Sequence, residues 1–461
     1  MKNTIAAAAT AMSEAGIGIV RVSGEDAIEI VNKIFQTKSG KKKLIDFDSH
    51  TIHYGFIVDE ENKVIDEVMV SLMKAPHSYT AENTVEINCH GGVLVVNRVL
   101  EAVIQNGARL AEPGEFTKRA FLNGRIDLSK AEAVMDIIHS KNQFALESSV
   151  KQLRGSVSVI IKKLRKELIY EIAFIESALD DPEHISLEGY PENLMGKTKE
   201  ILLELKKLLD YSDSGKMLKE GINTVIVGKP NAGKSSLLNL LVGEDRAIVT
   251  DIAGTTRDVL EESIKLHGIS LNIIDTAGIR STEDTVEKIG VEKAKKYALD
   301  ADLIIYMVDS SVPLDESDYE IIGMIGNKKA IVLLNKTDLD TVVTEEMLAK
   351  IFEKEDIVII KTSTKENTGI DIFEDKIKEM FFKGEISFND EVVITNMRHK
   401  EAIQHAYESM LQVKKSLEDH MPEDFYSIDL MSAYASLGTI IGEEVEEDLV
   451  NEIFSKFCMG K

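Results

Sequence analysis

Hydrophobic and polar residues follow three different rhythms along the chain. Residues 1 to about 118 switch between strand-like and helix-like spacing. Gly18–Val22 and Thr84–Asn88 have the pattern of strands, and Val93–Ile104 has that of a helix. Ser23 is a candidate N-cap for a further helix, whose apolar face comprises Ile28, Val31, Ile34 and Phe35. This mixture predicts an α+β domain at the N-terminus.

The second rhythm is helical and occurs twice. From about Leu128 to Asp210, apolar residues recur at intervals of three and four, as in Val157, Ile160, Ile161, Leu164 and Leu168. Asp180-Asp181-Pro182 predicts a break between two helices. After about Lys383 the spacing returns on a face made by Ile403, Ala406, Met410, Val413 and Leu417. A terminal helical stretch then runs through Phe457.

Between the helical segments, strands and helices alternate strictly. The predicted strands are Thr224–Val227, Ile269–Asp275, Leu303–Val308, Ala330–Leu334 and Ile357–Lys361. Such alternation predicts a mainly parallel sheet covered by helices. Matching helical segments on both sides indicate one discontinuous helical domain with the α/β domain inserted into it. The expected domains are 1–118 (α+β), 119–216 (helical, first part), 217–382 (α/β) and 383–461 (helical, second part).

Composition supports a folded chain and restricts its partners. Hydrophobic residues make up 44% and charged residues 29% of the 461 positions, near globular averages. Two cysteines, Cys89 and Cys458, are too few for a disulfide scaffold or a cysteine zinc site and fit a reducing cytosol. No export signal or membrane span is expected. The net charge of −25 repels nucleic acid, so RNA contact requires a local basic patch or a partner protein.

A phosphate-binding motif follows the first strand of the α/β domain. Gly228-Lys-Pro-Asn-Ala-Gly-Lys-Ser235 fits G-x-x-x-x-G-K-[ST]. The glycines let backbone N–H groups turn around phosphates at a helix N-terminus, Lys234 reaches the terminal phosphates and the Ser235 hydroxyl ligates Mg²⁺. The strand before it and the helix after it argue against a chance glycine-rich turn. Candidate nucleotide contacts here are Asn231, Ala232, Gly233, Lys234, Ser235 and Ser236.

The choice of base is predicted by Asn335-Lys336-Thr337-Asp338 at the end of a strand. The Asp338 carboxylate can accept from the guanine N1–H and 2-amino groups, whereas adenine offers no donor at either place. Lys336 lies over the base plane in such motifs. A backbone donor for the guanine oxygen is expected from Ser363, Thr364 or Lys365. Together the two motifs predict a domain that binds and hydrolyses GTP.

Two further segments fit the γ-phosphate and Mg²⁺. Asp275, followed by Thr276, Ala277 and Gly278, ends a strand, and its carboxylate would hold Mg²⁺ through water. Thr256 is the expected second Mg²⁺ ligand, in a loop whose other candidate contacts are Thr250, Asp251, Ile252, Ala253, Gly254 and Thr255. Ras-type GTPases have a water-orienting glutamine directly after this glycine. Ile279 stands there in this chain and cannot orient water, so another group must do so.

Several motifs together resemble the MnmE (TrmE) family of tRNA-uridine-modifying GTPases over essentially the whole chain. They are Asn231 in the phosphate loop, Thr250-Asp-Ile-Ala-Gly-Thr-Thr-Arg-Asp258, Asp275-Thr-Ala-Gly-Ile-Arg280, Phe121-Leu-Asn-Gly-Arg-Ile-Asp-Leu128 with Ala131-Glu-Ala133, and the terminal Cys458-Met-Gly-Lys461. The Phe-Leu-Asn-Gly-Arg segment and the final tetrapeptide single out the family. Its members usually have isoleucine or leucine where Met459 stands.

The resemblance implies potassium-stimulated GTP hydrolysis. Asn231 matches the family's potassium-ligating asparagine, and the remaining ligands match carbonyls of Thr250, Ile252 and Thr255. A monovalent cation beside the β- and γ-phosphates can replace the charge of an arginine finger. Glu287 matches the family's water-orienting glutamate. On the residues alone Glu287 is a solvated helix charge, and the resemblance reverses that reading.

The resemblance also implies a one-carbon folate module, holding a 5-formyl- or 5,10-methylene-tetrahydrofolate. Arg21, Glu82 and Arg125 match the family's folate-contacting positions, and Lys461 approaches the same site. A carboxylate suits the pterin N–H donors and arginine suits a carboxylate tail, but the residues do not say which takes which. Alternatively, the Arg125 motif only starts a helix, through a capping box at Ser129-Lys-Ala-Glu132, and Arg21 is a surface charge.

Other residues leave alternatives open. Cys458 is either a reactive thiol or a packing residue, and lipidation does not fit Lys461 as the last residue. Cys89 and His90 favour a turn-supporting role. Basic residues cluster at 41–43 and at 162–166; a solvated helix face is the default for the second, which is also a candidate RNA patch.

The expected function is therefore a GTPase that modifies C5 of the wobble uridine in certain tRNAs. As the resemblance implies, it would work with the flavoprotein MnmG, which carries FAD and uses NADH, and would be a homodimer through its N-terminal domain. A folate one-carbon unit and glycine or ammonium would supply a carboxymethylaminomethyl or aminomethyl group. Two alternatives remain: a ribosome-assembly GTPase acting as a binding switch, and a regulatory scaffold with a vestigial folate pocket.

Overall fold

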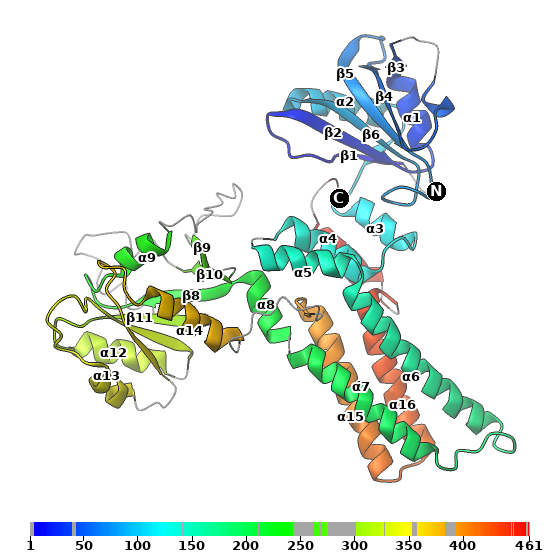
Figure 1. Ribbon diagram of the computed structural model, residues 1–461. Helices are drawn as coiled ribbons and strands as arrows, with labels where there is room; N and C mark the ends of the chain where they lie inside the picture. The colour runs from blue at the N-terminus through cyan, green and yellow to red at the C-terminus, as the bar shows by residue number, and fades with distance from the viewer. Residues whose placement is uncertain are drawn as a thin grey trace. The chain divides into compact units, whose positions relative to one another are not determined.

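A computed structural model describes residues 4–38, 43–140, 142–210, 212–242, 262–266, 269–274, 301–326, 328–352, 357–382, 393–443, 445, 447–457 and 460 (Figure 1). The chain forms two compact units, each assembled from separate stretches of sequence. The first unit comprises Met1–Ile138, Ser149–Ile201 and His405–Lys461. The second comprises His139–Ser148 and Leu202–Gln404. The bounds of the four predicted segments stay a prediction.

The N-terminal part of the first unit is a seven-stranded sheet in the order β3-β4-β5-β6-β2-β1-β7. Its strands are β1 (Ile5–Ala8), β2 (Ala15–Ser23), β3 (Phe35–Thr37), β4 (Thr51–Val58), β5 (Val64–Met73), β6 (Thr84–Gly91) and β7 (Arg109–Leu110). All pairings are antiparallel except that of β1 with β7. Helices α1 (Ala27–Ile34) and α2 (Val93–Gln105) pack on it, and the short helix η1 (Leu44–Asp46) precedes β4. Apolar side chains from both helices and alternate strand positions form the core, as the α+β prediction requires.

Two predicted helix caps are wrong. Ser23 is the last residue of β2, and its buried hydroxyl bonds to Thr80 and Glu82 in the loop between β5 and β6, so it does not cap α1, which begins after Asp26. Ser129 lies within α4 (Leu128–Ile138) instead of before it. The Asp127 carboxylate accepts from the Lys130 backbone N–H and from the Ser129 hydroxyl, because Asp127 is the residue just outside the first turn.

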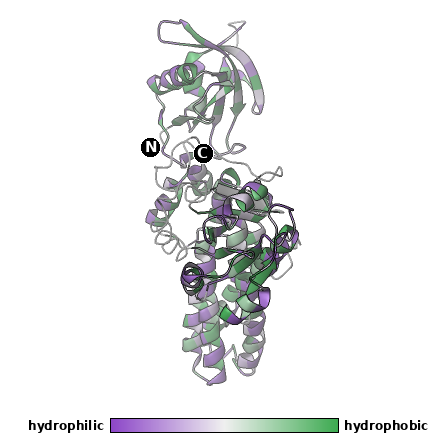
Figure 2. Ribbon diagram, turned by 90° about the vertical axis from the view of Figure 1, so that its left-hand side faces the viewer, coloured by the Kyte–Doolittle hydropathy of each residue, from purple (hydrophilic) through white to green (hydrophobic). Residues whose placement is uncertain are grey.

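Long helices form the rest of the first unit. They are α3 (Glu115–Leu122), α4, α6 (Ser156–Asp180), α16 (Glu423–Ile441) and α17 (Glu447–Ser455), while α5 (Gln143–Leu153), α7 (Tyr190–Asp210) and α15 (Met397–Glu418) have residues in both units. α6 lies along α16 (Figure 1). The predicted apolar faces of α6 and α15 are buried, with Ile160 only partly so. Hydrophobic and hydrophilic stretches alternate along these helices (Figure 2).

The second unit contains a six-stranded sheet in the order β13-β12-β11-β8-β10-β9. Its strands are β8 (Ile222–Val227), β9 (Glu262–Leu266), β10 (Ile269–Ile273), β11 (Leu303–Asp309), β12 (Ala330–Asn335) and β13 (Val358–Lys361). All neighbours are parallel except β9 and β10, so the predicted mainly parallel sheet is confirmed. Apolar clusters lie on both faces of the sheet. The helices are α8 (Ser212–Glu220), α9 (Lys234–Val242), α12 (Glu316–Ile325), α13 (Glu345–Phe352) and α14 (Ile370–Phe382).

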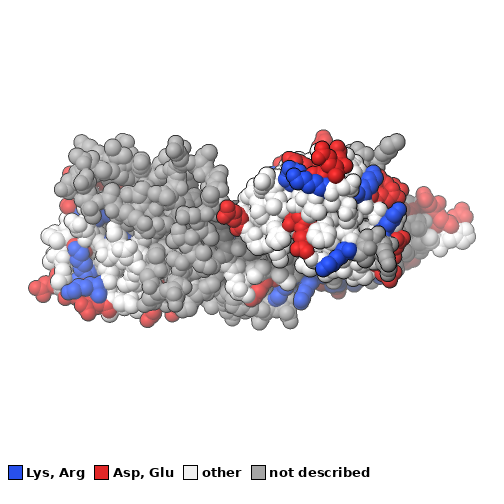
Figure 3. Space-filling model, turned by 90° about the horizontal axis from the view of Figure 1, so that it is seen from above, with Lys and Arg blue, Asp and Glu red and all other residues white. Residues whose placement is uncertain are grey.

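Within the part of the chain that the structure covers, no helix combines the length and the apolar character needed to cross a membrane. The face drawn in Figure 3 carries acidic and basic side chains close to one another.

Candidate functional site

The phosphate loop connects the end of β8 to the start of α9 and requires two of its glycines. Gly228 and Gly233 have φ angles of 152° and 108°, which L side chains rarely adopt. A Cβ on Gly228 would collide with the Met307 carbonyl oxygen, and one on Gly233 with the Asn335 amide nitrogen. The loop thus brings backbone N–H groups to the N-terminus of α9, where an anion is favoured.

Lys234 is the first residue of α9, and its ammonium group points back along the loop. Its Nζ donates to the carbonyl oxygens of Gly228 at 2.6 Å and Lys229 at 2.7 Å. Burial lowers the pKa of Lys234 to about 8, because desolvation disfavours the charged form. A polyanion bound at the loop would stabilise the charged ammonium form of Lys234.

Asn335 connects the phosphate loop to the predicted base-binding loops. This fully buried side chain donates from Nδ2 to the Ala232 carbonyl oxygen at 2.8 Å. Its Oδ1 accepts from the Thr364 backbone N–H at 3.0 Å. Because both ends of one amide are satisfied by different loops, the positions of these loops relative to each other are fixed.

Asp338 lies beside the loop that follows β13. Ser363 Oγ donates to Asp338 Oδ1 at 2.7 Å, and Lys365 Nζ lies 3.9 Å from Oδ2. The Ser363 hydrogen bond lowers the pKa of Asp338, so it is a carboxylate at neutral pH. An ionised carboxylate is the acceptor that two guanine N–H donors need.

The two central residues of the same motif are also anchored. Lys336 Nζ is 2.6 Å from Asp309 Oδ2 at the end of β11, and the Thr337 backbone N–H donates to the Thr362 carbonyl oxygen at 3.2 Å. The structure therefore brings together the predicted residues of the phosphate loop and of both base loops.

One residue of this site was not predicted from the sequence. Lys229, inside the phosphate loop, has its Nζ 2.7 Å from Asp318 Oδ2 and 3.0 Å from Asp315 Oδ2. Asp318 is 1% exposed and also accepts from the Tyr306 hydroxyl at 2.8 Å. These contacts attach the loop to the N-terminus of α12. The spacing of the two aspartates is typical of a helix cap, but nothing in the sequence connects them to Lys229.

A second cluster forms in the first unit around Tyr79. The guanidinium carbon of Arg125 lies 4.8 Å from the Tyr79 ring centroid, and that of Arg21 lies 5.4 Å from it. Arg21 also donates to Glu86 Oε1 at 2.8 Å and to the carbonyl oxygen of Gly460 at 3.1 Å. Two arginines predicted to bind folate are thus brought to one aromatic side chain, together with the C-terminal end of the chain.

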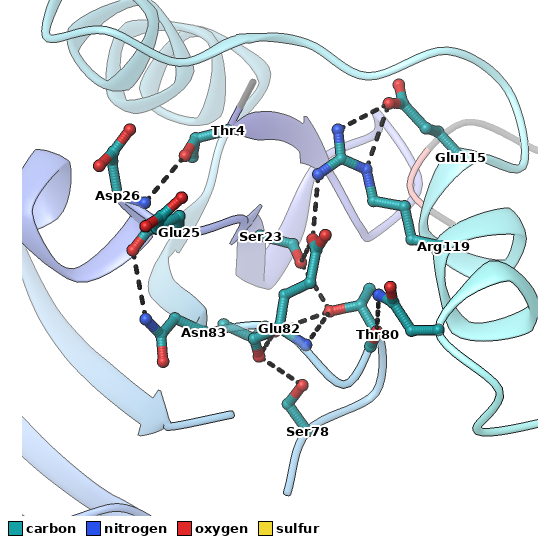
Figure 4. Close-up of polar contacts among 12 residues, drawn as sticks. Thr4, Ser23, Glu25, Asp26, Ser78, Thr80, Glu82, Asn83, Glu115 and Arg119 are labelled. Carbon is teal, nitrogen blue, oxygen red and sulfur yellow. Dashed lines mark hydrogen bonds and ion pairs between the residues drawn. The ribbon is translucent and has the colours of Figure 1, made fainter. Parts of the chain in front are cut away.

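Glu82, the third predicted folate residue, is held from two sides (Figure 4). Its Oε2 accepts from the Ser23 hydroxyl and from Arg119 NH1, both at 3.0 Å. Arg119 in turn bonds to the buried Glu115. The sequence did not indicate Tyr79, Arg119 or Glu115, because none stands in a recognised motif. The contact of Arg119 with Glu82 also spans 37 residues of sequence.

The remaining predicted site residues lie outside the described part of the chain. They are Thr250, Asp251, Ile252, Ala253, Gly254, Thr255, Thr256, Asp275, Thr276, Ala277, Gly278, Glu287, Cys458 and Lys461. Asn231, Ser235 and Ser236 are described and exposed at the phosphate loop and the first turn of α9.

The fold and the two loops define a P-loop GTPase domain, joined to a helical domain and to an N-terminal sheet domain. Residues 128–458 match the model of the MnmE helical domain, and residues 4–125 match the N-terminus of the GTP-binding protein TrmE. The chain belongs to the MnmE family of tRNA modification GTPases.

Named relatives are similar over the full length. A tRNA modification GTPase MnmE from Lachnoclostridium phytofermentans is 60% identical over all of this chain and 99% of the relative. Proteins of the same name from Alkaliphilus oremlandii and Clostridioides difficile are each 50% identical with the same coverage.

Solved structures match a smaller part of the chain. The G domain of the T. maritima FeoB iron transporter is 27% identical, covering 35% of this chain and 98% of that one, with a TM-score of 0.26. An Aquifex aeolicus Era structure is 28% identical, covering 41% of this chain and 67% of that one, with the same TM-score.

Proposed function

We propose that this protein hydrolyses GTP with Mg²⁺ and modifies C5 of the wobble uridine in certain tRNAs. Together with a flavin-dependent partner of the MnmG type, it builds an aminomethyl or carboxymethylaminomethyl group. Its one-carbon unit comes from a tetrahydrofolate and its nitrogen from ammonium or glycine, respectively. The observation that carries the GTPase part is the buried Asn335 amide, which fixes the phosphate loop against the base loop. The working protein is a homodimer through its N-terminal domain, in the cytoplasm, with the domain boundaries predicted above.

In the GTP site, each residue has a chemical role. Lys234 and the Ser235 hydroxyl meet the terminal phosphates and Mg²⁺, with Thr256 as the second magnesium ligand. Asn231 and the carbonyls of Thr250, Ile252 and Thr255 hold K⁺, which supplies positive charge where negative charge develops during hydrolysis. Glu287 orients the attacking water, a role that Ile279 cannot fill.

Replacing potassium with sodium should slow GTP turnover sharply, by about 10-fold or more, because the smaller ion does not fit a cage built for K⁺. The measurement is steady-state phosphate release at constant ionic strength. An Asn231→Ala variant should be slow in both salts while still binding GDP. Equal rates for the wild type in both salts would rule out the assignment of Asn231.

The folate assignment rests on the cluster around Tyr79. An aromatic ring with two guanidinium groups beside it suits a flat pterin and an anionic tail, and the Glu82 carboxylate suits pterin N–H donors. Tetrahydrofolate would supply the one-carbon unit there, and Arg21, Glu82, Arg125 and Lys461 would orient it. Arg21 also donates to the Gly460 carbonyl oxygen, so the described Gly460 lies against one of the arginines of this cluster.

Arg21→Ala should weaken binding of 5-formyltetrahydrofolate by about 10-fold or more, because a charge-assisted hydrogen-bond donor is lost. Calorimetric titration of the purified protein measures this. Arg98→Ala is the matched control, since Arg98 is a half-exposed arginine on α2 that pairs only loosely with Asp59 at 3.8 Å. Saturable binding by wild type and control, lost in the variant, supports the assignment. Absence of binding by the wild type would remove the folate chemistry and leave a GTPase of another kind.

A further inference from the structure

Helix α6 has two chemically different sides over its first half. One side is buried and apolar, formed by Val157, Ile161, Leu164 and Leu168. The other exposes the ammonium groups of Lys162, Lys163 and Lys166, which we call the α6 basic stripe. The side chains of Lys162 and Lys163 are 57% and 56% exposed. Because Lys166 follows Lys162 by four residues and Lys163 by three, it lies next to both of them on one face of the helix.

An aromatic residue continues the same face. Tyr170 follows Lys166 by four residues, and 68% of it is exposed. At a rise of 1.5 Å per residue, Lys162 and Tyr170 are about 12 Å apart along the helix axis. An exposed tyrosine next to cationic side chains is the combination that stacks a nucleic-acid base while neighbouring phosphates are neutralised.

The α6 basic stripe begins beside the candidate folate cluster. Asp127 stands two residues after Arg125 in the sequence, and its Oδ2 accepts from the Ser158 hydroxyl at the start of α6 at 2.7 Å. The same carboxylate oxygen lies 4.0 Å from Lys162 Nζ and 3.8 Å from Lys130 Nζ. One short stretch therefore leads from Arg125 to the lysines, all within the first compact unit.

We propose that the α6 basic stripe binds the tRNA backbone next to the uridine that enters the folate cluster, with Tyr170 stacking on a flanking base. The inference rests on the proposed function, and it assigns the surface that the sugar–phosphate backbone of the tRNA contacts. A chain with net charge −25 repels a polyanion at long range, so binding requires a local cationic surface at the reacting site. Asp127 Oδ2 lies 4.0 Å from Lys162 Nζ, and Glu167 Oε1 lies 3.9 Å from Lys163 Nζ. Ion pairs of this length at solvent-exposed lysines are weak, so phosphates can replace them.

The test measures tRNA binding by the full-length protein at several salt concentrations, using fluorescence anisotropy of an unmodified tRNA transcript. The triple variant K162Q/K163Q/K166Q should bind about 10-fold more weakly or worse, and the slope of log affinity against log salt should fall by about 2 to 3, since three phosphate contacts are lost. Tyr170→Ala should weaken binding several-fold and leave the slope unchanged, because stacking carries no charge.

The matched control is K197Q/K199Q/K456Q, which removes three exposed lysines from the same compact unit. It should bind tRNA within about 2-fold of the wild type, and all variants should retain GTP turnover. If the stripe variant and the control lose affinity equally, the effect is one of net charge and the proposal is overturned. A stripe variant with normal tRNA affinity that loses binding of a protein partner also overturns it. If the wild type itself binds no tRNA, the proposed function fails first, and the α6 assignment with it.

Discussion

Replacing Asp338 with asparagine should reduce affinity for GTP by about 10³-fold or more. The carboxylate offers acceptors to both the N1–H and the 2-amino group of guanine, and asparagine replaces one acceptor with an NH₂ donor that faces the 2-amino group. Sites built to hydrogen-bond a substrate discriminate by about 10⁴ to 10⁵ when the partner is wrong, because buried polar groups are left unpaired. Calorimetry with GDP and a non-hydrolysable GTP analogue measures the loss.

Xanthine nucleotides provide the matched control for this variant. Xanthine has a carbonyl where guanine has its amino group, so the asparagine NH₂ can donate to it and binding should recover. Ser363→Ala removes only the hydroxyl that donates to Asp338 Oδ1 at 2.7 Å, and should cost about 10-fold or less. Normal GTP affinity in the asparagine variant, or equal affinity of the wild type for ATP and GTP, would contradict base recognition by this residue.

The helices and strands that were predicted most completely are those in which the apolar residues, regularly spaced in the sequence, are also the residues buried in the fold. The apolar face of α6 from Val157 to Leu168 and the apolar face of α15 from Ile403 to Leu417 are buried, as their periodicity indicated. The parallel strands were found because each is a short, mainly apolar segment that alternates with helical segments. The caps failed where polar side chains had competing partners. Ser23 donates to Glu82 in the loop before β6, and Ser129 donates to Asp127 instead of capping α4.

The two candidate sites differ in how much of them the sequence contains. The phosphate and base loops are local motifs, so Lys234, Asn335 and Asp338 could be named from their spacing alone. Their connections could not, because the Asn335 amide bonds to Ala232, 103 residues away. Lys229 gave no signal for the same reason, since its partners Asp315 and Asp318 are more than 80 residues away and become neighbours only when β8 and β11 pair.

The candidate folate cluster around Tyr79 depends even more on contacts between residues that are distant in the sequence. Arg21, Glu82 and Arg125 came from a family resemblance, and their spacing in the chain indicates no common site. The alternation of side chains along β2 helps to bring these residues together. Arg21 and Ser23 lie on one face of β2, because alternate residues of a strand point the same way, and Ser23 reaches Glu82. Tyr79 belongs to a loop and Arg119 to helix α3. The sequence of neither segment has a pattern of polar residues that indicates a site.

Glu115→Gln should destabilise the first compact unit by about 2 to 3 kcal/mol, which is a fall in melting temperature of several degrees. Glu115 is buried and accepts from Arg109, Arg119 and the Glu112 backbone N–H. A neutral amide takes the Glu115 charge away from both guanidinium groups and turns an NH₂ donor toward them, although Arg119 keeps its contact with Glu82. This expected loss of stability is smaller than the usual cost of breaking a buried ion pair, because Arg109 is 42% exposed and solvent screens its charge.

The dependence of this effect on pH separates a charge effect from a packing effect. Burial raises the pKa of Glu115, but the hydrogen bonds from Arg109, Glu112 and Arg119 outweigh it and hold the pKa below its usual range. A lowered folded-state pKa means that the unfolded chain takes up the proton first. The contribution of the carboxylate is therefore complete above the unfolded pKa of about 4.3 and is lost as pH falls through the lower folded value.

Thermal melts of wild type and Glu115→Gln should consequently differ most above about pH 5 and converge in acid. Glu112→Gln is the control, because Glu112 is exposed and its side chain can change without breaking the Glu115 contacts. The variant should also bind 5-formyltetrahydrofolate more weakly, since Arg119 would no longer be held against Glu82. A stability difference that is constant from pH 7 to pH 3 would show that the amide disturbs packing alone and that the carboxylate's charge does not hold Arg119 in place.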